Sequence, residues 1–339
     1  MKATREILEG IVAGQDLSAR ESEAIFSAIM RGEWSPAQMG ALLMGLRMKG
    51  QRVEELVGAT RALRAFMTRV EVDGSHLVDT CGTGGDACNT FNISTAAALV
   101  AAAAGARVAK HGNRAVSGRS GSADVLEAVG LNLDLRPEQV AACIDHVGIG
   151  FLFAPAHHGA MRHAVGPRKE LGIRSLFNLM GPLSNPAGAP HQVLGVYSES
   201  WLTPLAEAAR ELGERHVLVV HGHDGLDEIS LSGPTEVAEL RDGEVHRYRL
   251  QPGDFGLQAA PLAALQIADV AEAAAAFLGV LQNQAGPRRD IVLLNAGAAL
   301  YAADVVSDLA AGVKRAREVM DSGAVWAKWE DLLQCAREV

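Results

Sequence analysis

The stretch 76–112, HLVDTCGTGGDACNTFNISTAAALVAAAAGARVAKHG, contains the pattern that decides the fold. A short apolar run, HLVDT, ends in the glycine-rich loop CGTGGD. The alanine-rich segment NISTAAALVAAAAGA then predicts a helix, and RVAKHG predicts a second strand. Two strands joined through a helix form a βαβ unit, so we expect these strands to be parallel.

Further strands are expected where GFLFAP, HQVLGVY, HVLVVHG and DIVLLNAG occur, at 150–155, 191–197, 216–222 and 290–297. Most are followed by polar or glycine-rich loops and then by helical segments, which is typical of an open α/β sheet. The stretch RDGEVHRYRL at 241–250 predicts an antiparallel hairpin. Ligands of such sheets bind at the carboxyl ends of the strands, where the polar loops lie.

Residues 1–72 have only helical patterns. Ser18 with Glu21, and Ser35 with Gln38, have the spacing of capping boxes. The basic segment 158–188 interrupts the strand–helix alternation, and we assign it to the same helical unit. The prediction is therefore an α/β protein with a small helical domain (1–72 and 158–188) and a larger α/β domain. The larger domain (73–157 and 189–339) has a mainly parallel central sheet, and the chain crossings between the two can act as hinges.

Composition excludes several classes of protein. A chain of 339 residues is long enough for two domains, and its net charge of −9 argues against a general nucleic-acid binder. We find no signal-peptide pattern and no apolar run long enough to span a membrane. The four cysteines lack C-x-x-C spacing, which favours reduced thiols in a cytoplasmic protein.

The loop after the first strand favours an anion. Glycines let backbone N–H groups approach a ligand closely, and a helix start offers free N–H groups to phosphate. The residues concerned are Gly82, Gly84, Gly85, Asp86, Asn92, Ser94 and Thr95. An ordinary glycine turn with an N-cap is the alternative, and the loop matches neither a Walker motif nor G-x-G-x-x-G.

The loop after the second strand, within AKHGNRAVSGRSGSAD at 109–124, combines cations with hydroxyl groups. Lys110, Arg114 and Arg119 supply positive charge. Neutral hydrogen-bonding groups come from His111, Asn113, Ser117, Ser120 and Ser122, and flexibility from Gly112, Gly118 and Gly121. A solvated connector is the alternative. Two anion-binding loops at adjacent strand ends predict one ligand with phosphates at both ends.

Asp227 and Glu228 follow another strand, in VVHGHDGLDEIS. Carboxylates repel phosphate but can hold Mg²⁺ that binds it, so we expect a solvent-accessible magnesium site. A solvated acidic turn is one alternative. A zinc site is the other, drawing on His221, His223, Asp224, Asp227 and Glu228, with His157 and His158. It is less favoured because no H-E-x-x-H motif is present.

The segment 153–186 brings His158, Arg168 and Arg174 together beside Gly-Pro turns. Arginine pairs with a carboxylate through two parallel N–H groups, which lysine cannot do. A basic surface helix is the alternative.

Seven motifs now occur in order: CGTGGD, FNIST, KHGNR-V, SGSAD-LEA-G, FLFAP--H-AM, RKELGIR--FNL-GPL-NP and DGLDE. Together they resemble the anthranilate phosphoribosyltransferase family of tryptophan biosynthesis, over nearly the whole chain. The resemblance implies the nucleoside phosphorylase/phosphoribosyltransferase-like fold and a homodimer formed through the helical domain. It also implies transfer of a phosphoribosyl group from phosphoribosyl pyrophosphate (PRPP) to the amine of anthranilate, with Mg²⁺ and release of pyrophosphate.

The resemblance also assigns residues. Matching PRPP contacts are Gly82, Gly85, Asp86, Thr90, Asn92, Ile93, Ser94, Thr95, Lys110, His111, Gly112, Asn113, Arg114, Ala115, Val116, Ser117, Gly118 and Ser122. Matching magnesium ligands are Ser94, Asp227 and Glu228. Matching anthranilate contacts are Gly82, Asn113 and Arg168, with His158 on the path by which anthranilate enters. We expect Lys110, Asn113 and Arg168 to contribute most to the reaction.

Three positions depart from the family pattern. Ala115 and Gly118 stand where serines are usual, and Arg119 where lysine is usual. The first two changes remove possible phosphate contacts, which backbone N–H groups can replace. Two other functions stay open at this point: a pyrimidine nucleoside phosphorylase, and a non-enzymatic, nucleic-acid-binding relative of the same fold. The motifs KHGNR and DGLDE argue against the first, and the acidic net charge against the second.

Overall fold

The predicted βαβ unit is present: β1 (Leu77–Gly82) and β2 (Arg107–Gly112) are parallel, with α5 (Ile93–Ala103) between them in the chain. The computed structural model describes residues 3–115 and 118–339. It extends this pair to a seven-stranded sheet of order β3-β2-β1-β4-β5-β6-β7. The other strands are β3 (Ile149–Phe153), β4 (His191–Gly195), β5 (His216–Gly222), β6 (Thr235–Arg241) and β7 (Glu244–Leu250). The pairs β5–β6 and β6–β7 are antiparallel and the other pairs are parallel, so the mainly parallel sheet and the hairpin are both confirmed.

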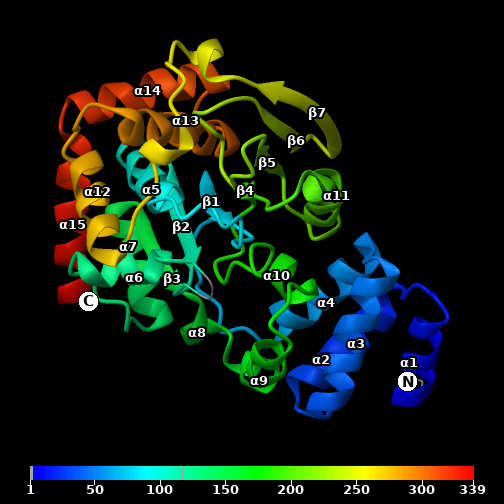
Figure 1. The fold of residues 1–339 in the computed structure, drawn as a ribbon. Coiled ribbons are helices and arrows are strands. Elements are labelled where there is room, and N and C mark those ends of the chain that lie inside the picture. Colours follow the sequence, from blue (N-terminus) through cyan, green and yellow to red (C-terminus); the bar gives the residue numbers. More distant parts are fainter. Residues whose placement is uncertain (1–2, 116–117) are drawn as a thin grey trace.

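Buried side chains alternate between the two faces of the sheet. In β5, Leu218 and Val220 belong to one apolar cluster, whereas Val217 and Val219 belong to another. The first face packs against α5 and α13 (Pro287–Ala302). Behind these two helices pack α12 (Val270–Leu281), α14 (Leu309–Asp321) and α15 (Ala324–Glu338), which belong to the same apolar cluster. α7 (Pro137–Val147) packs on β3, α11 (Leu202–Glu211) packs on β5 and β6, and α6 (Ser122–Ala128) packs on α12. Figure 1 shows these helices enclosing the sheet.

One predicted strand is wrong, because residues 290–297 belong to α13. Every residue from Ile291 to Leu300 is buried, since this helix packs against α5, α14 and the sheet. A helix buried all round shows no period of 3.6 residues, so a short apolar run of this kind resembles a buried strand. The signal for a helix was Pro287 in its first turn, after Gly286 at φ 138°.

The N-terminal residues form α1 (Thr4–Val12), α2 (Ala19–Met30), α3 (Pro36–Lys49) and α4 (Val53–Phe66). Both predicted capping boxes, Ser18 with Glu21 and Ser35 with Gln38, are confirmed. The later segment forms α8 (Ala154–His157), α9 (Arg162–Leu171) and α10 (Leu176–Met180). α9 packs against α2 and α3, and α10 packs against α3 and α4 (Figure 1).

The two lobes of the molecule are the helical part around α1 to α4 and the α/β part around the sheet. Where the chain passes from one lobe to the other, its outgoing and returning segments are joined by hydrogen bonds. Thr68 donates its backbone N–H to the carbonyl of His157 (2.8 Å), and Val70 donates to Pro186 (3.1 Å). The outgoing and returning chains therefore run side by side. In the part of the chain that the structure describes, no helix is both long and apolar enough to cross a membrane.

Candidate active site at the carboxyl edge of the sheet

The three loops singled out in the sequence meet at one edge of the sheet. They follow β1, β2 and β5, and β4 is the strand that separates β1 from β5. Gly84 donates its N–H to Asp227 Oδ2 (2.9 Å), and Ser94 donates its N–H to Glu228 Oε1 (3.1 Å). From the loop after β2, Ser120 exchanges hydrogen bonds with Asn92, and within β2 itself Lys110 Nζ lies 3.4 Å from Ser94 Oγ. Each loop is thus bonded to at least one of the other two.

Glycine is required where the loops approach most closely. A Cβ atom at Gly82 would lie 2.4 Å from Asp227 Oδ2, and one at Gly195 would lie 1.5 Å from the Asp227 carbonyl oxygen. Gly85 has a φ of +77°, which side chains disfavour. These positions let the acidic loop rest directly on the backbone of β1 and β4.

Asp227 and Glu228 are half-buried, so the pair expected to be solvent-accessible is only partly exposed. Burial raises the pKa of Asp227 well above its usual value, and the nearby Asp86 and Glu228 raise it further. Burial raises the pKa of Glu228 to about 7, although Lys110 opposes this change. The two carboxylates therefore lie where a further positive charge would stabilise their ionised forms.

Lys110 is itself buried at β2 and is not an exposed loop cation. Its ammonium group donates to the carbonyl of Thr80 and lies beside Ser94. Thr80 in turn donates its hydroxyl to the carbonyl of Ser94 (2.9 Å). These bonds hold the start of α5 against the ends of β1 and β2.

At the start of α5, side chains and backbone divide their roles. Ile93 and Thr95 turn their side chains into the core, which leaves only their backbone groups for a ligand. Asn92 exchanges hydrogen bonds with Ser120, which joins the helix start to the loop after β2. Thr90 forms an isolated bridge with Gln266.

The loop after β2 is organised around Asp124. This carboxylate accepts the N–H groups of Ala115 and Gly121, both at 2.9 Å. Ser122 donates its hydroxyl to the carbonyl of Asn113 (3.3 Å). A Cβ at Gly112 would lie 2.2 Å from Ser122 Oγ. Two predicted contacts in this loop, Val116 and Ser117, lie outside the described residues.

The cations of this loop are less available than the sequence suggests. Arg114 forms an ion pair with Glu127 (2.7 Å), which offsets its charge. Arg119 donates to the carbonyl of Ile267 (2.8 Å). At Gly118 an added Cβ would meet nothing within 4 Å.

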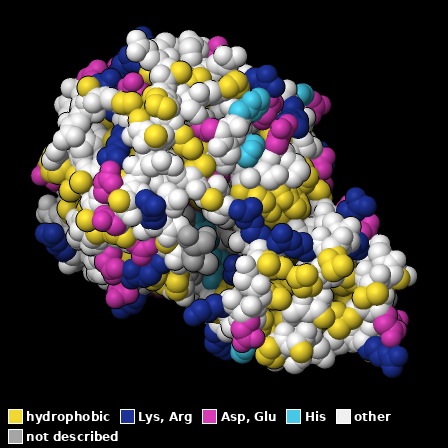
Figure 2. Space-filling view, viewed as in Figure 1, with side chains coloured by type: hydrophobic (Ala, Val, Ile, Leu, Met, Phe, Trp, Pro, Cys, Tyr) yellow, Lys and Arg dark blue, Asp and Glu magenta, His cyan; other side chains and the backbone are white. Residues whose placement is uncertain are grey.

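The side of the candidate site opposite the three loops is formed by the segment from α8 to α10. The Arg168 guanidinium lies over the Phe177 ring at 5.0 Å, and burial lowers its pKa. Among the described residues, no carboxylate forms an ion pair with Arg168. Arg174 donates to the carbonyl of Gly85 and lies over the ring of Tyr197, 4.3 Å from its centroid. Figure 2 shows a hollow between the two lobes, with Lys and Arg side chains gathered along it.

Two histidines meet between the lobes. His158 Nε2 lies 3.2 Å from His111 Nε2. Burial lowers the pKa of His158 to about 4, and burial together with His158 holds the pKa of His111 well below its usual value. Both rings are therefore neutral near pH 7.

The structure separates the residues of the alternative zinc site. His221 lies 2.7 Å from the carbonyl of Val196, and His223 lies 3.0 Å from Glu236. Asp224 instead accepts hydrogen bonds from Ser230 and Ser232. These partners hold the side chains apart from Asp227 and Glu228.

A buried cluster of hydrogen bonds around Asp79 lies beneath the loops and was not predicted from the sequence. Asp79 accepts the N–H of His111 (3.1 Å) and the amide of Asn185 (2.8 Å). Asn185 also donates to the carbonyl of Ala109 (2.8 Å). The available signal was an aspartate inside an apolar strand, because a buried carboxylate needs hydrogen-bond partners.

The donor set at this edge fits Mg²⁺. Asp227 and Glu228 offer carboxylate oxygens, and Ser94 adds a hydroxyl next to Glu228. Mg²⁺ prefers such oxygen ligands and retains waters when it binds beside phosphates. The raised pKa values of both carboxylates are consistent with a place for a cation.

Comparison with known proteins agrees with this geometry. Residues 74–326 match the family model of the glycosyl transferase family a/b domain, and residues 5–67 match its helical bundle domain. The anthranilate phosphoribosyltransferase of Acidithiobacillus ferrooxidans is 75% identical over 329 residues, which cover 97% of either chain. That of Thioalkalivibrio sulfidiphilus is 60% identical over the same share.

Solved structures give the same result. Anthranilate phosphoribosyltransferase from Thermus thermophilus superposes with a TM-score of 0.92 at 45% identity, covering 97% of this chain and 99% of that one. The enzyme from Saccharomyces cerevisiae, in complex with PRPP and Mg, gives a TM-score of 0.91 at 26% identity. That match covers 99% of this chain and 98% of the yeast chain. From its sequence, its fold and this arrangement of loops, the chain belongs to the anthranilate phosphoribosyltransferase family.

Proposed function

We propose that this protein transfers the phosphoribosyl group of PRPP to the amine of anthranilate and releases pyrophosphate. The observation that carries the proposal is the contact of all three loops at one sheet edge. Gly84 is bonded to Asp227, Ser94 to Glu228, and Lys110 lies beside Ser94. Anion-binding backbone, a buried cation and a carboxylate pair are the parts that a pyrophosphate with its metal ion requires.

The PRPP site would lie between the loops after β1 and β2. The described residues assigned to it are Gly82, Gly85, Asp86, Thr90, Asn92, Ile93, Ser94, Thr95, Lys110, His111, Gly112, Asn113, Arg114, Ala115, Gly118 and Ser122. The helix dipole at the start of α5 favours phosphate there, although the N–H groups of Ile93 and Ser94 already donate to Phe91 and Glu228. Arg114 would contribute mainly through its backbone, since Glu127 already occupies its guanidinium.

Ser94, Asp227 and Glu228 would hold Mg²⁺ at this site. The yeast relative in complex with PRPP and Mg supports a role for this ion, and the oxygen donors of the three residues support their assignment. When bound, Mg²⁺ neutralises negative charge that develops on the leaving pyrophosphate. Asp227 is fixed by Gly84, and Glu228 by Ser94, so both carboxylates are oriented before a ligand arrives.

The chain's own groups account for the rest of the mechanism. Loss of pyrophosphate gives the ribose C1 carbon oxocarbenium character, and Lys110 would stabilise charge on the departing group. The aromatic amine of anthranilate is uncharged at pH 7, so no strong base is needed. The neutral His111 and His158 are consistent with a reaction that depends on positioning beside C1.

Anthranilate would bind on the side of the helical wall. Gly82, Asn113, His158 and Arg168 are the residues assigned to it. Arg168 has no ion-pair partner among the described residues, and a partly buried guanidinium is stabilised by a carboxylate. The carboxylate of anthranilate is a matching group, and the yeast relative in complex with 4-fluoroanthranilate is consistent with such a site.

Residues 158–188 would move with residues 1–72 as one helical domain. The contacts of α9 and α10 with α2, α3 and α4 support this division. The Phe26 and Phe177 rings, 5.5 Å apart, join the two parts. Closure at the crossings near Thr68 and Val70 would bring Arg168 toward PRPP and exclude water.

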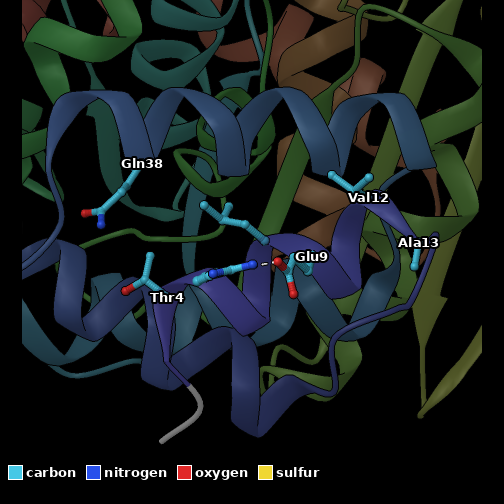
Figure 3. Close-up of a pocket in the computed structure, with 7 residues that line it drawn as sticks. Thr4, Glu9, Val12, Ala13 and Gln38 are labelled. Atoms are coloured by element: carbon cyan, nitrogen blue, oxygen red, sulfur yellow. Dashed lines mark hydrogen bonds and ion pairs between the residues drawn. The ribbon is translucent and has the colours of Figure 1, made fainter.

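A second copy of the chain would cover the outer face of the helical domain. An apolar hollow lies between α1 and α3, lined in part by Thr4, Glu9, Val12, Ala13 and Gln38 (Figure 3). Val12 on α1 is 86% exposed to solvent, and Met48 on α3 is 81% exposed. Exposed apolar groups of this kind are typical of an interface.

If the protein is a homodimer, light scattering should give a molar mass twice that of one chain. Val12→Asp should shift that mass toward the monomer, because a charge would be buried in the interface. Ala310→Asp is the matched control, since this alanine is exposed on α14 of the α/β domain, away from the helical domain, and should leave the mass unchanged. A monomeric wild type would contradict the proposal.

The activity itself is tested by the loss of anthranilate fluorescence when PRPP and Mg²⁺ are added. Thymidine with phosphate is the control for nucleoside phosphorylase activity. We expect consumption of anthranilate and no cleavage of thymidine.

A further inference from the structure

A second group of metal-ligating side chains lies at the opposite, amino edge of the sheet. His191 begins β4, His216 begins β5, and the two residues pair directly in the parallel register. Asp304 follows the end of α13 and faces both. One potential ligand atom from each residue lies within 4.8 Å of the other two. We propose that these residues bind a divalent transition-metal ion of the zinc class.

The separations of the atoms fit such an ion. His216 Nδ1 is 3.0 Å from Asp304 Oδ1, and His191 Nδ1 is 3.9 Å from Asp304 Oδ2. Ligands about 2.0–2.1 Å from a tetrahedral zinc ion lie roughly 3.3 Å from one another. The observed separations lie on either side of that value, so small side-chain movements would complete the arrangement.

His191 supplies an unused ligand atom. Its side chain is 6% exposed and lies near the backbone carbonyl of Ala302, and its Nδ1 is buried without a well-formed hydrogen bond among the described residues. An unpaired polar atom at such a place costs free energy unless a ligand satisfies it. This nitrogen lies on the side of Asp304, where an ion would be bound.

His216 has the surroundings of a metal-bound imidazole. Its Nε2 lies 2.9 Å from Glu239 Oε1, and Glu239 also accepts the hydroxyl of Tyr301 (2.8 Å). When Nε2 donates to that carboxylate, Nδ1 presents a lone pair to Asp304. A lone pair facing a carboxylate oxygen at 3.0 Å is unfavourable unless a cation or a second proton lies between them. A carboxylate on the remote nitrogen is the usual partner of a histidine that binds metal.

The residues also distinguish this site from the magnesium site. Two imidazoles and one carboxylate suit zinc, whereas Mg²⁺ prefers oxygen ligands. Asp304 is about half exposed, at 49%, which leaves room for water as a fourth ligand. The length of β4, five residues, separates this edge from Gly195 beside Asp227 by roughly 13 Å. The ion would join the end of α13 to the starts of β4 and β5.

The test is a titration of tag-free, chelator-treated protein with Co²⁺ and then Zn²⁺, in excess Mg²⁺ to occupy the carboxyl edge. We expect one equivalent of Co²⁺ with visible absorption bands of a low-coordinate site, displaced by one equivalent of Zn²⁺. Zn²⁺ should also raise the melting temperature, because it binds the folded chain. The same binding should persist in the double variant Asp227→Asn, Glu228→Gln.

Asp304→Asn is the decisive variant. The side chain is half exposed, and asparagine tolerates the φ of +54° at this position, so the fold should survive. We expect Zn²⁺ affinity to fall by at least about tenfold, within the range seen when a metal site loses a supporting group. Asp242→Asn is the matched control, since Asp242 has a φ of +53° and is 95% exposed.

Three results would overturn the proposal. The first is no saturable Co²⁺ or Zn²⁺ binding in the double variant. The second is equal affinity in Asp304→Asn and Asp242→Asn. The third is an NMR spectrum in which the His216 ring carries both protons at pH 7.5 and does not change with Zn²⁺, which would make it an imidazolium between two carboxylates.

Discussion

The two walls of the candidate active site are the sheet edge and the helical segment. They differ in whether their charged side chains already have hydrogen-bond or ion-pair partners within the protein. On the side of the sheet, Lys110, Asp227 and Glu228 each have a hydrogen-bond partner within the protein. On the helical side, Arg174 already donates to the carbonyl of Gly85, whereas the Arg168 guanidinium has a ring beneath it but no ion pair among the described residues.

This difference indicates two ways of binding. The sheet edge is ordered before the ligand arrives, so it can hold a multiply charged pyrophosphate and its metal ion at little cost in reorganisation. The helical wall instead carries a charge that awaits its partner, and it sits on a segment beside the chain crossings. We therefore expect substitutions on the first wall to affect PRPP, and substitutions on the second to affect anthranilate.

The largest effect is expected from the acidic pair. The double variant Asp227→Asn, Glu228→Gln should lower kcat/KM by at least about 100-fold, because both charged ligands of the metal ion are lost. A chelator should abolish wild-type activity, and Zn²⁺ should not restore it in place of Mg²⁺. Circular dichroism provides the control for folding. Full activity of the double variant would show that the pair does not hold the metal.

The next effect separates PRPP from anthranilate. Lys110→Ala should raise the KM for PRPP about 10- to 100-fold, since a hydrogen bond to a charged group contributes about 1.5–3 kcal/mol. The KM for anthranilate should change far less. Steady-state kinetics with each substrate varied in turn provide the measurement. If only the anthranilate KM rose, the positions of the two substrates would be reversed.

Arg168→Ala should have a smaller effect, and it should change the KM for anthranilate more than the KM for PRPP. The KM for anthranilate should rise at least about tenfold, or about 1.4 kcal/mol, because its carboxylate loses a partner. The KM for PRPP should barely change, and aniline should be a poor substrate for both proteins. Arg162→Ala on the same helix is the matched control, since this arginine is exposed. Equal losses for both substrates, with a lower melting temperature, would indicate that Arg168 only braces α9.

The smallest effect concerns a departure from the family pattern. Gly118→Ser should improve PRPP affinity by about 0.5–1.5 kcal/mol if the hydroxyl makes one neutral hydrogen bond. A Cβ at this position meets nothing within 4 Å, and Gly118 is not among the glycines with positive φ. Unchanged or weaker binding, measured by calorimetry with PRPP, would show that the backbone alone serves this position.

The positions of the glycine-rich and cationic loops were predictable from the sequence, because each of these loops follows an apolar run with clear ends. HLVDT and RVAKHG lead to the glycine and cationic loops, and parallel pairing brings those loops to one edge. The capping boxes at Ser18 and Ser35 were also readable, since they depend on side chains three residues apart.

Other features depend on partners distant in the sequence. α13 resembled a strand because its environment, not its own pattern, decides that all of its sides are buried. The burial of Asp227 follows from the backbones of Gly82 and Gly195, and the charge of Arg114 is offset by Glu127. The pairing of His191 with His216 likewise appears only once β4 lies beside β5.

We propose that the sheet edge and the helical wall together join anthranilate to PRPP. The most direct measurement follows anthranilate fluorescence and pyrophosphate release in the same reaction of the wild-type protein. We predict one pyrophosphate released for each anthranilate consumed, only with both PRPP and Mg²⁺ present. Pyrophosphate release that is independent of anthranilate, or no loss of fluorescence with a folded protein, would contradict the account.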